Sequence, residues 1–336
     1  MSRRADVDIV VVGAGPAGTA AAICSRRAGL RVAILDRAAF PRFQVGESLH
    51  PGVEVILDKL GVAERIVKHA LIRYDGIWIE RGGSRSFAPF GADRRGRWCG
   101  LQVERAELDR ALCDKARELG AVVLQPCRVR GVVRDGADML IDCEQGTLRA
   151  RIVIDATGAR RFVATQLGGE PVLCSPRIIA RYGYRAGEAP RLSDRPVFIT
   201  KRSGWQWIAR VRPGVYQWIT ACWGADGLNR DDVPHQLRGL RESAPTRGAD
   251  VSWRILREPA GRGYFAVGDA AAVLDPSSSH GVLRALSTGI MAAYCARARL
   301  RKNAEESTII RFYNGWVRRW FTADCDRLRD IRRRRW

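Results

Sequence analysis

The stretch Gly13-Ala14-Gly15-Pro16-Ala17-Gly18 decides the fold prediction, because a strand pattern precedes it and a helix pattern follows it. Asp8-Ile9-Val10-Val11-Val12 is a continuous apolar run, typical of a parallel strand buried on both faces. Small residues from Thr19 to Ile23 indicate a helix, and Arg31 to Leu35 indicates a second strand that ends in Asp36. This order of strand, glycine turn, helix, strand and acid predicts a unit that binds an adenine dinucleotide.

Each glycine of the turn has a separate expected role. Gly13 permits the tight turn, Gly15 lets the backbone approach a pyrophosphate, and Gly18 lets the helix pack closely on the strand. The N-terminus of the helix offers free N–H groups and a positive dipole end to the phosphates. Asp36 lies 18 residues beyond Gly18, where a carboxylate can accept hydrogen bonds from a ribose diol.

The remaining chain alternates between helix and strand patterns. We expect helices over 51–67, 103–119 and from about 270 to 300, and one or two basic helices over 305–336; a hairpin over 77–87 across Gly82-Gly83; short strands over 122–141; buried strands over 151–155 and 263–269; and alternating aromatic strands over 178–222. The dinucleotide-binding unit is therefore interrupted by a β-rich insertion and completed afterwards.

Composition bounds the class of protein. With 336 residues, 46% of them hydrophobic, the chain can form a substantial core, which excludes intrinsic disorder. No run of about 18 apolar residues occurs, so no stable membrane span is expected. Nine scattered cysteines, without a C-x-x-C pair, argue against a disulfide framework and against a metal site, and favour a reduced, cytoplasmic protein.

The net charge of +21 calls for a partner of opposite sign or for another explanation. There are 52 arginines and only five lysines, a skew that a coding bias also produces. Nucleic acid, an anionic membrane and an acidic protein are the partner classes that the charge allows.

A second acid suggests which dinucleotide binds. Val267-Gly268-Asp269-Ala270-Ala271 places a carboxylate directly after a strand and near the start of a helix, where it could bond a ribityl hydroxyl. Pro276 and Gly281 then shape a loop whose backbone can lie against a flat ring.

Together these motifs resemble the glutathione-reductase-type flavoproteins, in the branch of aromatic hydroxylases, flavin-dependent halogenases and geranylgeranyl reductases. The matching residues are Gly13, Gly15, Gly18 and Asp36; Arg42-Phe43-Gln44-Val45-Gly46-Glu47-Ser48-Leu49; Arg105 within Glu104–Leu108; Asp155-Ala156-Thr157-Gly158; and Gly268-Asp269 through Gly281. The resemblance implies an α/β fold in which a Rossmann-type FAD-binding domain is interleaved with a β-rich substrate domain and followed by C-terminal helices. It implies FAD-binding segments 1–75, 98–170 and 255–300, substrate-domain segments 76–97 and 171–254, and a basic helical segment 301–336.

The same resemblance implies a set of cofactor contacts. They are Gly13, Gly15, Ala17, Gly18, Asp36, Arg37, Arg42, Glu47, Ser48, Arg105, Val129, Asp155, Gly158, Gly268, Asp269, Pro276, Gly281 and Val282. Arg42 and the turn Gly46-Glu47-Ser48 would lie near the isoalloxazine, or the turn is an ordinary surface turn. Arg105 would contact the pyrophosphate or ribityl region, or is a solvated helix charge; Asp269 would be a ribityl ligand, or a helix cap.

The segment around Asp155 departs from the family pattern. Aromatic hydroxylases place an Asp-Gly pair beside FAD and the nicotinamide cofactor, whereas Ala156-Thr157 here separates Asp155 from Gly158. This departure leaves two electron sources open, NAD(P)H itself and a separate flavin reductase.

Three reactions fit the resemblance. A flavin C4a-hydroperoxide can hydroxylate an aromatic ring or oxidise a halide, and without oxygen the flavin can hydrogenate an alkene. Gly204-Trp205-Gln206-Trp207-Ile208-Ala209-Arg210 matches the Trp-x-Trp-x-Ile-Pro of halogenases only in part, and strand packing explains the tryptophan pair equally well. Halogenases also need a lysine before Arg105, and none occurs between His69 and Glu104, so hydroxylation ranks above halogenation.

Ser277-Ser278-Ser279-His280-Gly281 is the most distinctive local feature. The ordinary pKa of histidine suits His280 to catalytic proton transfer near the flavin, with a loop hydrogen bond as the alternative. The stretch is similar to flavoprotein maturases of tryptophan-derived quinone cofactors. That resemblance implies an indole substrate on a precursor protein.

A nucleic-acid-binding protein is the contrasting class. Its support is the tail, with Arg318, Arg319, Arg327, Arg329, Arg332 to Arg335 and Trp336. No nucleic-acid-binding signature accompanies the tail, so we expect these arginines to dock an acidic protein that carries the aromatic substrate.

Overall fold

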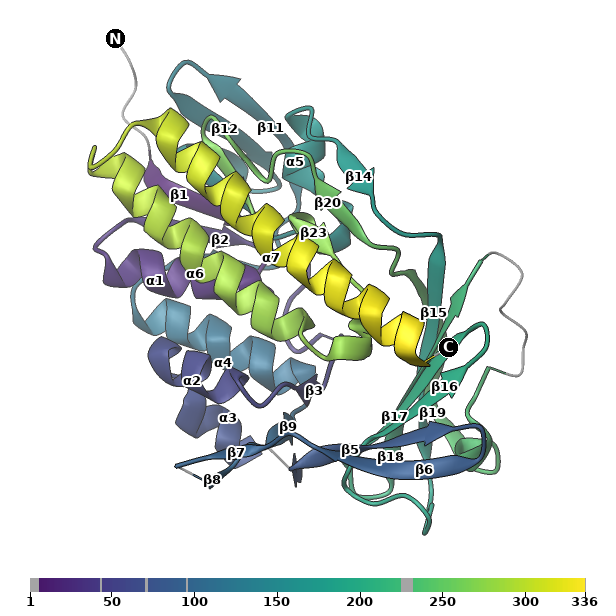
Figure 1. Cartoon of the computed structure of the whole chain (residues 1–336). Helices are drawn as coiled ribbons and strands as arrows, with labels where there is room; N and C mark the ends of the chain where they lie inside the picture. The colour runs from purple at the N-terminus through teal and green to yellow at the C-terminus, as the bar shows by residue number, and fades with distance from the viewer. Residues whose placement is uncertain (1–5, 43, 70–71, 95, 225–231, 336) are drawn as a thin grey trace.

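The computed structural model describes residues 6–42, 44–69, 72–94, 96–224 and 232–335. Two large sheets and four long helices make up most of the molecule (Figure 1). Phe43 and Trp336 lie outside the described residues, as do the side chains of Ser278 and Arg332 to Arg335.

The first sheet is built around the strand that precedes the glycine turn. Its strands are β1 (Val7–Val12), β2 (Val32–Leu35), β10 (Val122–Leu124), β11 (Val129–Asp135), β12 (Asp138–Cys143), β13 (Gly146–Asp155), β21 (Ala260–Gly261) and β22 (Tyr264–Ala266). Strand β1 lies between β2 and β13 and is parallel to both. Strands β11 and β12 extend β13 as antiparallel neighbours. The sheet thus has a parallel centre and an antiparallel edge, as in an α/β fold.

Both faces of β1 are covered, which explains its unbroken apolar run. Ile9 and Val11 belong to the core beneath the helices, whereas Val10 and Val12 belong to a second core under β11, β12 and α5 (Phe162–Gln166). All four side chains are buried.

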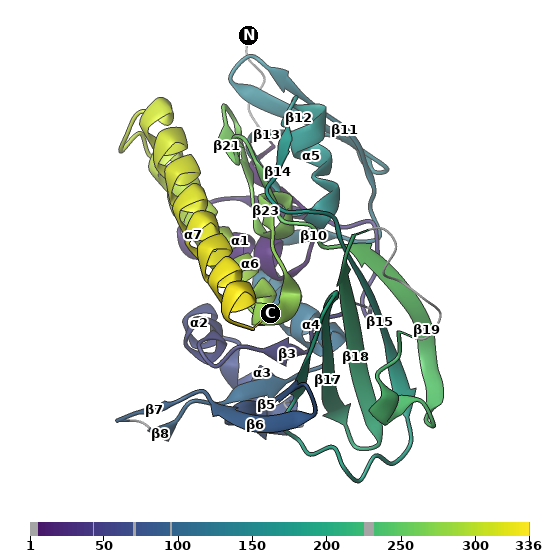
Figure 2. The same cartoon turned by 45° about the vertical axis from the view of Figure 1, so that its right-hand side comes forward.

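Four long helices form a layer on one side of this sheet, and Figure 2 shows the second sheet beside that layer. They are α1 (Pro16–Arg27), α4 (Arg105–Glu118), α6 (Gly281–Leu300) and α7 (Glu306–Arg335). Helix α1 packs against α4 and α6, and α7 packs on α6. The backbones of α6 and α1 lie so close together that no side chain fits between them at Gly289. A Cβ there would lie 2.1 Å from the carbonyl oxygen of Ala17.

The second sheet gathers strands from two distant parts of the chain. Its order is β19 (Arg241–Asp250), β15 (Ile178–Ala186), β18 (Val215–Trp223), β17 (Gly204–Arg212), β16 (Val197–Lys201), β5 (Gly76–Arg81) and β6 (Ser84–Pro89). All neighbours are antiparallel except β16 and β5, which pair in parallel. The pairing of β5 with β6 confirms the expected hairpin over 77–87. Most strands of the predicted substrate-domain segments, 76–97 and 171–254, lie in this second sheet.

Shorter elements complete the fold. The remaining strands are β3 (Ser48–Leu49), β4 (Ile72–Tyr74), β7 (Ala92–Asp93), β8 (Gly96–Arg97), β9 (Gly100–Gln102), β14 (Pro171–Leu173), β20 (Arg254–Leu256) and β23 (Ala272–Val273). The remaining helices are α2 (Val53–Leu60) and α3 (Ala63–His69), with 3-10 turns at Gly158–Arg160, His235–Leu237, Gly268–Ala270 and Pro276–Ser278.

Two boundaries differ from the sequence prediction. The helix expected over 51–67 is broken into α2 and α3 at Gly61, whose φ of 71° is left-handed. Helix α6 begins only at Gly281, because two 3-10 turns and β23 occupy the chain after Val267. The tail, expected as one or two helices, forms one continuous helix, α7. Among the described residues, no helix combines the length and apolarity needed to cross a membrane.

Two helical glycines give a matched test of the α1–α6 contact. We expect Gly289→Ala to cost about 1–3 kcal/mol of unfolding free energy, because the new methyl group overlaps the α1 backbone. Gly315→Ala in α7 meets only the guanidinium tip of Arg319, 3.5 Å away, and is expected to be neutral or up to about 1 kcal/mol stabilising. Urea unfolding of both variants measures the difference; equal stabilities would refute the close approach.

Candidate active site

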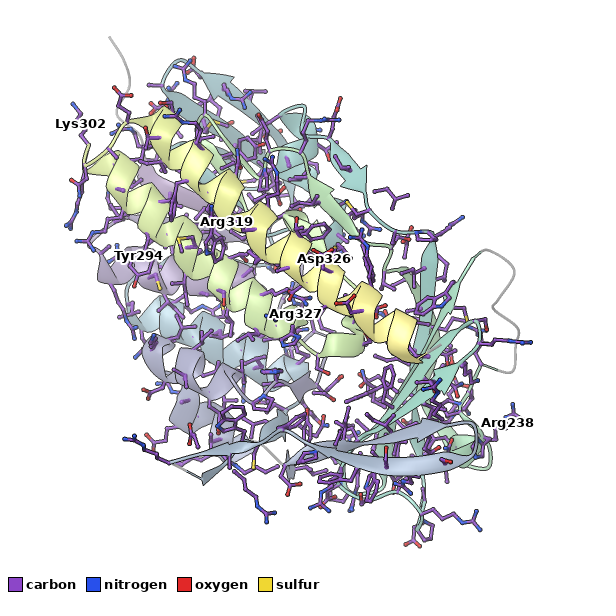
Figure 3. The ribbon with its side chains drawn as sticks, viewed as in Figure 1. Arg238, Tyr294, Lys302, Arg319, Asp326 and Arg327 are labelled. Atoms are coloured by element: carbon purple, nitrogen blue, oxygen red, sulfur yellow. The ribbon has the colours of Figure 1, made fainter. Side chains whose placement is uncertain are left out.

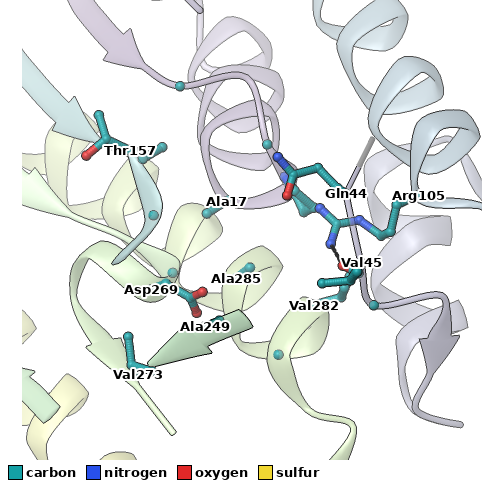
Figure 4. A pocket seen from close by; sticks show the side chains of 18 of the residues that line it. Ala17, Gln44, Val45, Arg105, Thr157, Ala249, Asp269, Val273, Val282 and Ala285 are labelled. Atoms are coloured by element: carbon teal, nitrogen blue, oxygen red, sulfur yellow. Dashed lines mark hydrogen bonds between the residues drawn. The ribbon is translucent and has the colours of Figure 1, made fainter. Parts of the chain in front are cut away.

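A cavity of about 630 Å³ lies between the carboxyl end of β1, the N-terminus of α6 and one face of the second sheet. Figure 4 shows Asp269 and Ala285 on one side of this pocket and Arg105 with Val45 on another. Most of the predicted cofactor contacts line it: Gly13, Gly15, Ala17, Asp36, Arg37, Arg42, Ser48, Arg105, Val129, Gly158, Gly268, Asp269, Pro276, Gly281 and Val282.

Close backbone packing requires glycine at two positions of the turn, and the third glycine faces the pocket. Gly13 has a φ of 109°, and a Cβ there would lie 2.3 Å from the carbonyl oxygen of Ala156. A Cβ at Gly18 would lie 2.0 Å from the carbonyl oxygen of Gly13. Gly15 instead lines the pocket, where a Cβ would meet only the guanidinium of Arg42, at 3.5 Å. The turn therefore presents bare backbone and the N-terminus of α1 to the cavity.

Asp36 marks one end of the pocket. It is 4% exposed, and its Oδ2 accepts hydrogen bonds from the Ala14 N–H and from Arg42, both at 2.7 Å. The Cys127 N–H donates to the Asp36 carbonyl at 2.7 Å, which brings Val129 to the same end. Asp36 holds the guanidinium of Arg42, the residue expected near the isoalloxazine, on this wall of the pocket.

A buried acid behind the pocket wall holds two arginines. Asp109 in α4 is 0% exposed and lies 3.1 Å from Arg105 and 3.6 Å from Arg42. Arg105 also donates to the Val45 carbonyl at 2.6 Å. Sequence analysis missed Asp109, although its i,i+4 spacing from Arg105 was a usable signal. The pair of guanidinium groups suits a pyrophosphate.

Asp269 also lines the pocket. It follows β22 within the 3-10 turn Gly268–Ala270, and its side chain is exposed to the cavity. Burial raises the pKa of Asp269, while the positive charges of Arg105 and Arg284 act to lower it. A carboxylate enclosed in this way can accept a hydrogen bond from a ligand hydroxyl. The first residues of α6, Gly281 and Val282, face the same space.

Glu47 does not line the pocket, although Ser48 does. It is 5% exposed; its Oε1 is hydrogen-bonded to the Tyr184 hydroxyl, and its Oε2 accepts from the Gly46 N–H. Burial raises the pKa of Glu47, which favours its neutral form. We therefore correct its expected role from cofactor contact to a hydrogen bond that joins the loop before β3 to β15.

Asp155 is also turned away from the cavity. Its Oδ1 accepts from the N–H and hydroxyl of Thr157, and its Oδ2 accepts from the Ala164 N–H. With 0% exposure and both oxygens in use, Asp155 shapes the loop before α5 and is not available to a cofactor. Gly18 likewise serves packing and not ligand contact.

His280 does not line the described cavity, contrary to its expected catalytic role. Its ring lies 4.3 Å from that of His50, and burial lowers the pKa of His280 to about 4, aided by His50 and Arg284. The imidazole is therefore neutral at pH 7 and poorly suited to proton transfer there. It occupies the position before the first turn of α6.

The second sheet supplies the pocket's roof. Residues that alternate along four strands line it: Ala180 and Tyr182 in β15, Trp205 and Trp207 in β17, Gln217 and Ile219 in β18, and Ala249 and Val251 close to the end of β19. The tryptophans are 2% and 5% exposed. Their alternation was visible in the sequence, but which face met the pocket was not.

The described residues fit FAD. Bare backbone at Gly15, the guanidinium groups of Arg42 and Arg105, and the carboxylates of Asp36 and Asp269 all line one cavity. Among these described residues, no group of three or more His, Cys, Asp or Glu side chains could hold a metal ion. All nine cysteines are free thiols.

Comparison with known proteins identifies the family of this chain. The signature of the FAD binding domain family matches residues 6–178. A tryptophan 2-halogenase of Chondromyces crocatus is 27% identical over 95% of this chain and 67% of its own length. A menaquinone reductase of Mycolicibacterium smegmatis is 30% identical over 87% of this chain and 76% of its own length.

Solved structures share the whole fold. The flavin-dependent halogenase CmlS superposes with a TM-score of 0.85 and 26% identity, over 96% of this chain and 63% of its own. The peptidyl tryptophan dihydroxylase QhpG superposes with a TM-score of 0.73 and 23% identity, over 95% of this chain and 73% of its own, which is a likeness of fold.

The two turn glycines separate cofactor binding from folding. We expect Gly15→Ala to weaken FAD binding about 10–100-fold, because a methyl group there keeps a phosphate from the charged hydrogen bonds of the α1 N-terminus. The apoprotein should keep its stability, since Gly15 has an extended backbone with φ −73° and ψ −179°. Gly13→Ala should instead destabilise the apoprotein. FAD titration and thermal unfolding of both apoproteins test this; intact FAD affinity in Gly15→Ala would remove the turn from the cofactor site.

Proposed function

The chain belongs to the FAD binding domain family, as an FAD-dependent enzyme of the monooxygenase and halogenase superfamily, and from this premise we propose that it hydroxylates an aromatic substrate. The observation that carries the proposal is the composition of the pocket: an aromatic roof of Tyr182, Trp205 and Trp207 without any lysine among the described lining residues.

The roof accounts for binding and orientation. FAD, when bound and reduced, supplies the activation of molecular oxygen. The apolar faces of the two tryptophans exclude water and offer a flat surface on which an aromatic ring can stack. Phe198 stacks on Trp205 at 5.7 Å between ring centroids, which keeps that indole in place. One oxygen atom would enter the ring and the other would leave as water.

Halogenation is the second candidate, and the names of the relatives favour it over hydroxylation. The lysine that the halogenase resemblance requires has no counterpart in the pocket. Lys59, Lys68 and Lys115 lie in α2, α3 and α4, Lys201 ends β16 and Lys302 follows α6, and none of them lines the cavity. Because one relative is a menaquinone reductase, we include alkene reduction as a further outcome of the test.

We propose that the substrate ring, an indole for example, is carried by an acidic protein. The support is the surplus of exposed arginine: Figure 3 shows Arg319 and Arg327 on α7 and Arg238 beside the second sheet. Such docking is expected to weaken as the ionic strength rises from low to physiological values.

Mass spectrometry separates the three reactions. The protein is incubated with FAD, a flavin reductase, NADH, oxygen and chloride or bromide, in the presence of tryptophan-containing acidic peptides. Hydroxylation adds one oxygen atom, halogenation replaces a hydrogen with a halogen, and alkene reduction, run anaerobically with a polyprenyl or quinone substrate, adds two hydrogens. A halogenated product without a hydroxylated one would replace our main proposal with its alternative.

The electron donor can be tested independently. Because Asp155 is fully engaged within its own loop, we expect NADPH alone to leave the bound FAD oxidised. When a flavin reductase is added, the FAD should become reduced. The loss of flavin absorbance under anaerobic conditions measures this reduction. Rapid bleaching by NADPH alone would show a direct donor site.

A further inference from the structure

Arg284 brings a positive charge to the wall of the pocket at the N-terminus of α6. It lies in the first turn of α6 and lines the cavity together with Gly281, Val282 and Ala285. Its side chain is 14% exposed. Asp269 lines the same cavity, and the positive charge of Arg284 acts to lower the pKa of that carboxyl.

The C-terminal helix holds this arginine. The Arg284 Nε donates to Oδ2 of Asp324 in α7 at 2.9 Å, and the guanidinium carbon lies 5.7 Å from the ring centroid of Trp320. Asp324 also lies 3.8 Å from Arg327, which is 78% exposed. Helix α7 therefore contributes the counter-charge of a residue that lines the cofactor pocket.

Arg105, Arg161 and Arg254 also act on the carboxylate of Asp269, but of these arginines only Arg284 lies in the first turn of α6. The two histidines nearby, His50 and His280, both have pKa values lowered by burial and are neutral at pH 7. Arg105 is held at the pocket wall by Asp109 and the Val45 carbonyl. The N-terminus of α6 adds a partial positive charge of the same sign as Arg284.

We infer that Arg284 stabilises the negative charge that FAD gains on reduction, and that Asp324 of α7 sets how strongly this charge is felt. A fixed cation at the flavin end of the pocket favours the anionic reduced cofactor, and a guanidinium keeps its charge at any working pH. The carboxylate of Asp324 offsets part of that field. The C-terminal helix is thereby a tuning element for the reduction potential, and Arg284 and Asp324 act as a positioned pair.

The test is the midpoint potential of bound FAD, measured without substrate or oxygen. We expect Arg284→Met to lower the potential, because the reduced anion loses its cation. Asp324→Asn should raise it, because the Arg284 charge is then less compensated. A purely structural role for the pair would move both potentials in one direction or neither, so the opposite signs are diagnostic.

Two control variants complete the design. Arg319→Met removes the same charge from an exposed position of α7 and is expected to leave the potential close to that of the unmodified protein. Arg284→Lys should recover part of the potential lost in Arg284→Met. If Arg284→Met fails to bind FAD, Asp324→Asn alone decides: an unchanged or lowered potential overturns the inference.

The inference rests on FAD binding and not on the proposed reaction. A hydroxylase, a halogenase and an alkene reductase would all show the opposite shifts. If the midpoint potentials do not shift as expected, the proposed reaction is unaffected. If mass spectrometry shows another reaction, the inference about Arg284 and Asp324 is unaffected.

Discussion

The close contact of α1 with its two neighbours is the constraint on which the site depends. At one side, Gly18 brings α1 against Gly13 and β1; at the other, Gly289 brings α6 against the backbone of Ala17. Because both contacts are at backbone distance, the relative position of the two helices has little freedom. The N-termini of α1 and α6 consequently face one cavity from two directions. That arrangement suits a ligand with phosphates in its middle and a ring that gains negative charge at one end.

Three arginines of the cavity are held by buried or half-buried acids. Asp36 and Asp109 hold Arg42, Asp109 also holds Arg105 within α4, and Asp324 of α7 holds Arg284. Guanidinium groups fixed in this way lose little freedom when a ligand arrives, which favours tight binding. Part of the chain's large positive charge thus lies on arginines of the cavity that have acidic partners within the protein. The docking of an acidic protein that we propose would draw on the exposed arginines of α7, such as Arg319.

Sequence patterns predicted what is local and missed what depends on distant contacts. The glycine turn, its flanking strands and the pocket position of Asp269 follow from short motifs, since strand and turn geometry are decided within a few residues. Asp109 was missed because nothing near it in the sequence shows that α4 faces Arg42. Asp155 and His280 were assigned by resemblance, but loop side chains turn toward whichever partners the tertiary structure offers. For Asp155 these are Thr157 and Ala164.

The hairpin of β5 and β6 has a consequence for how the chain folds. Among the described residues its partner in the rest of the second sheet is β16, and Ile79 pairs with Phe198 across more than a hundred intervening residues. Those intervening residues include β10 to β13 of the first sheet. During synthesis, β5 therefore emerges long before the strand that completes it, with one edge unpaired. This edge stays exposed until the chain has passed Lys201, an interval in which cellular chaperones are suited to protect it.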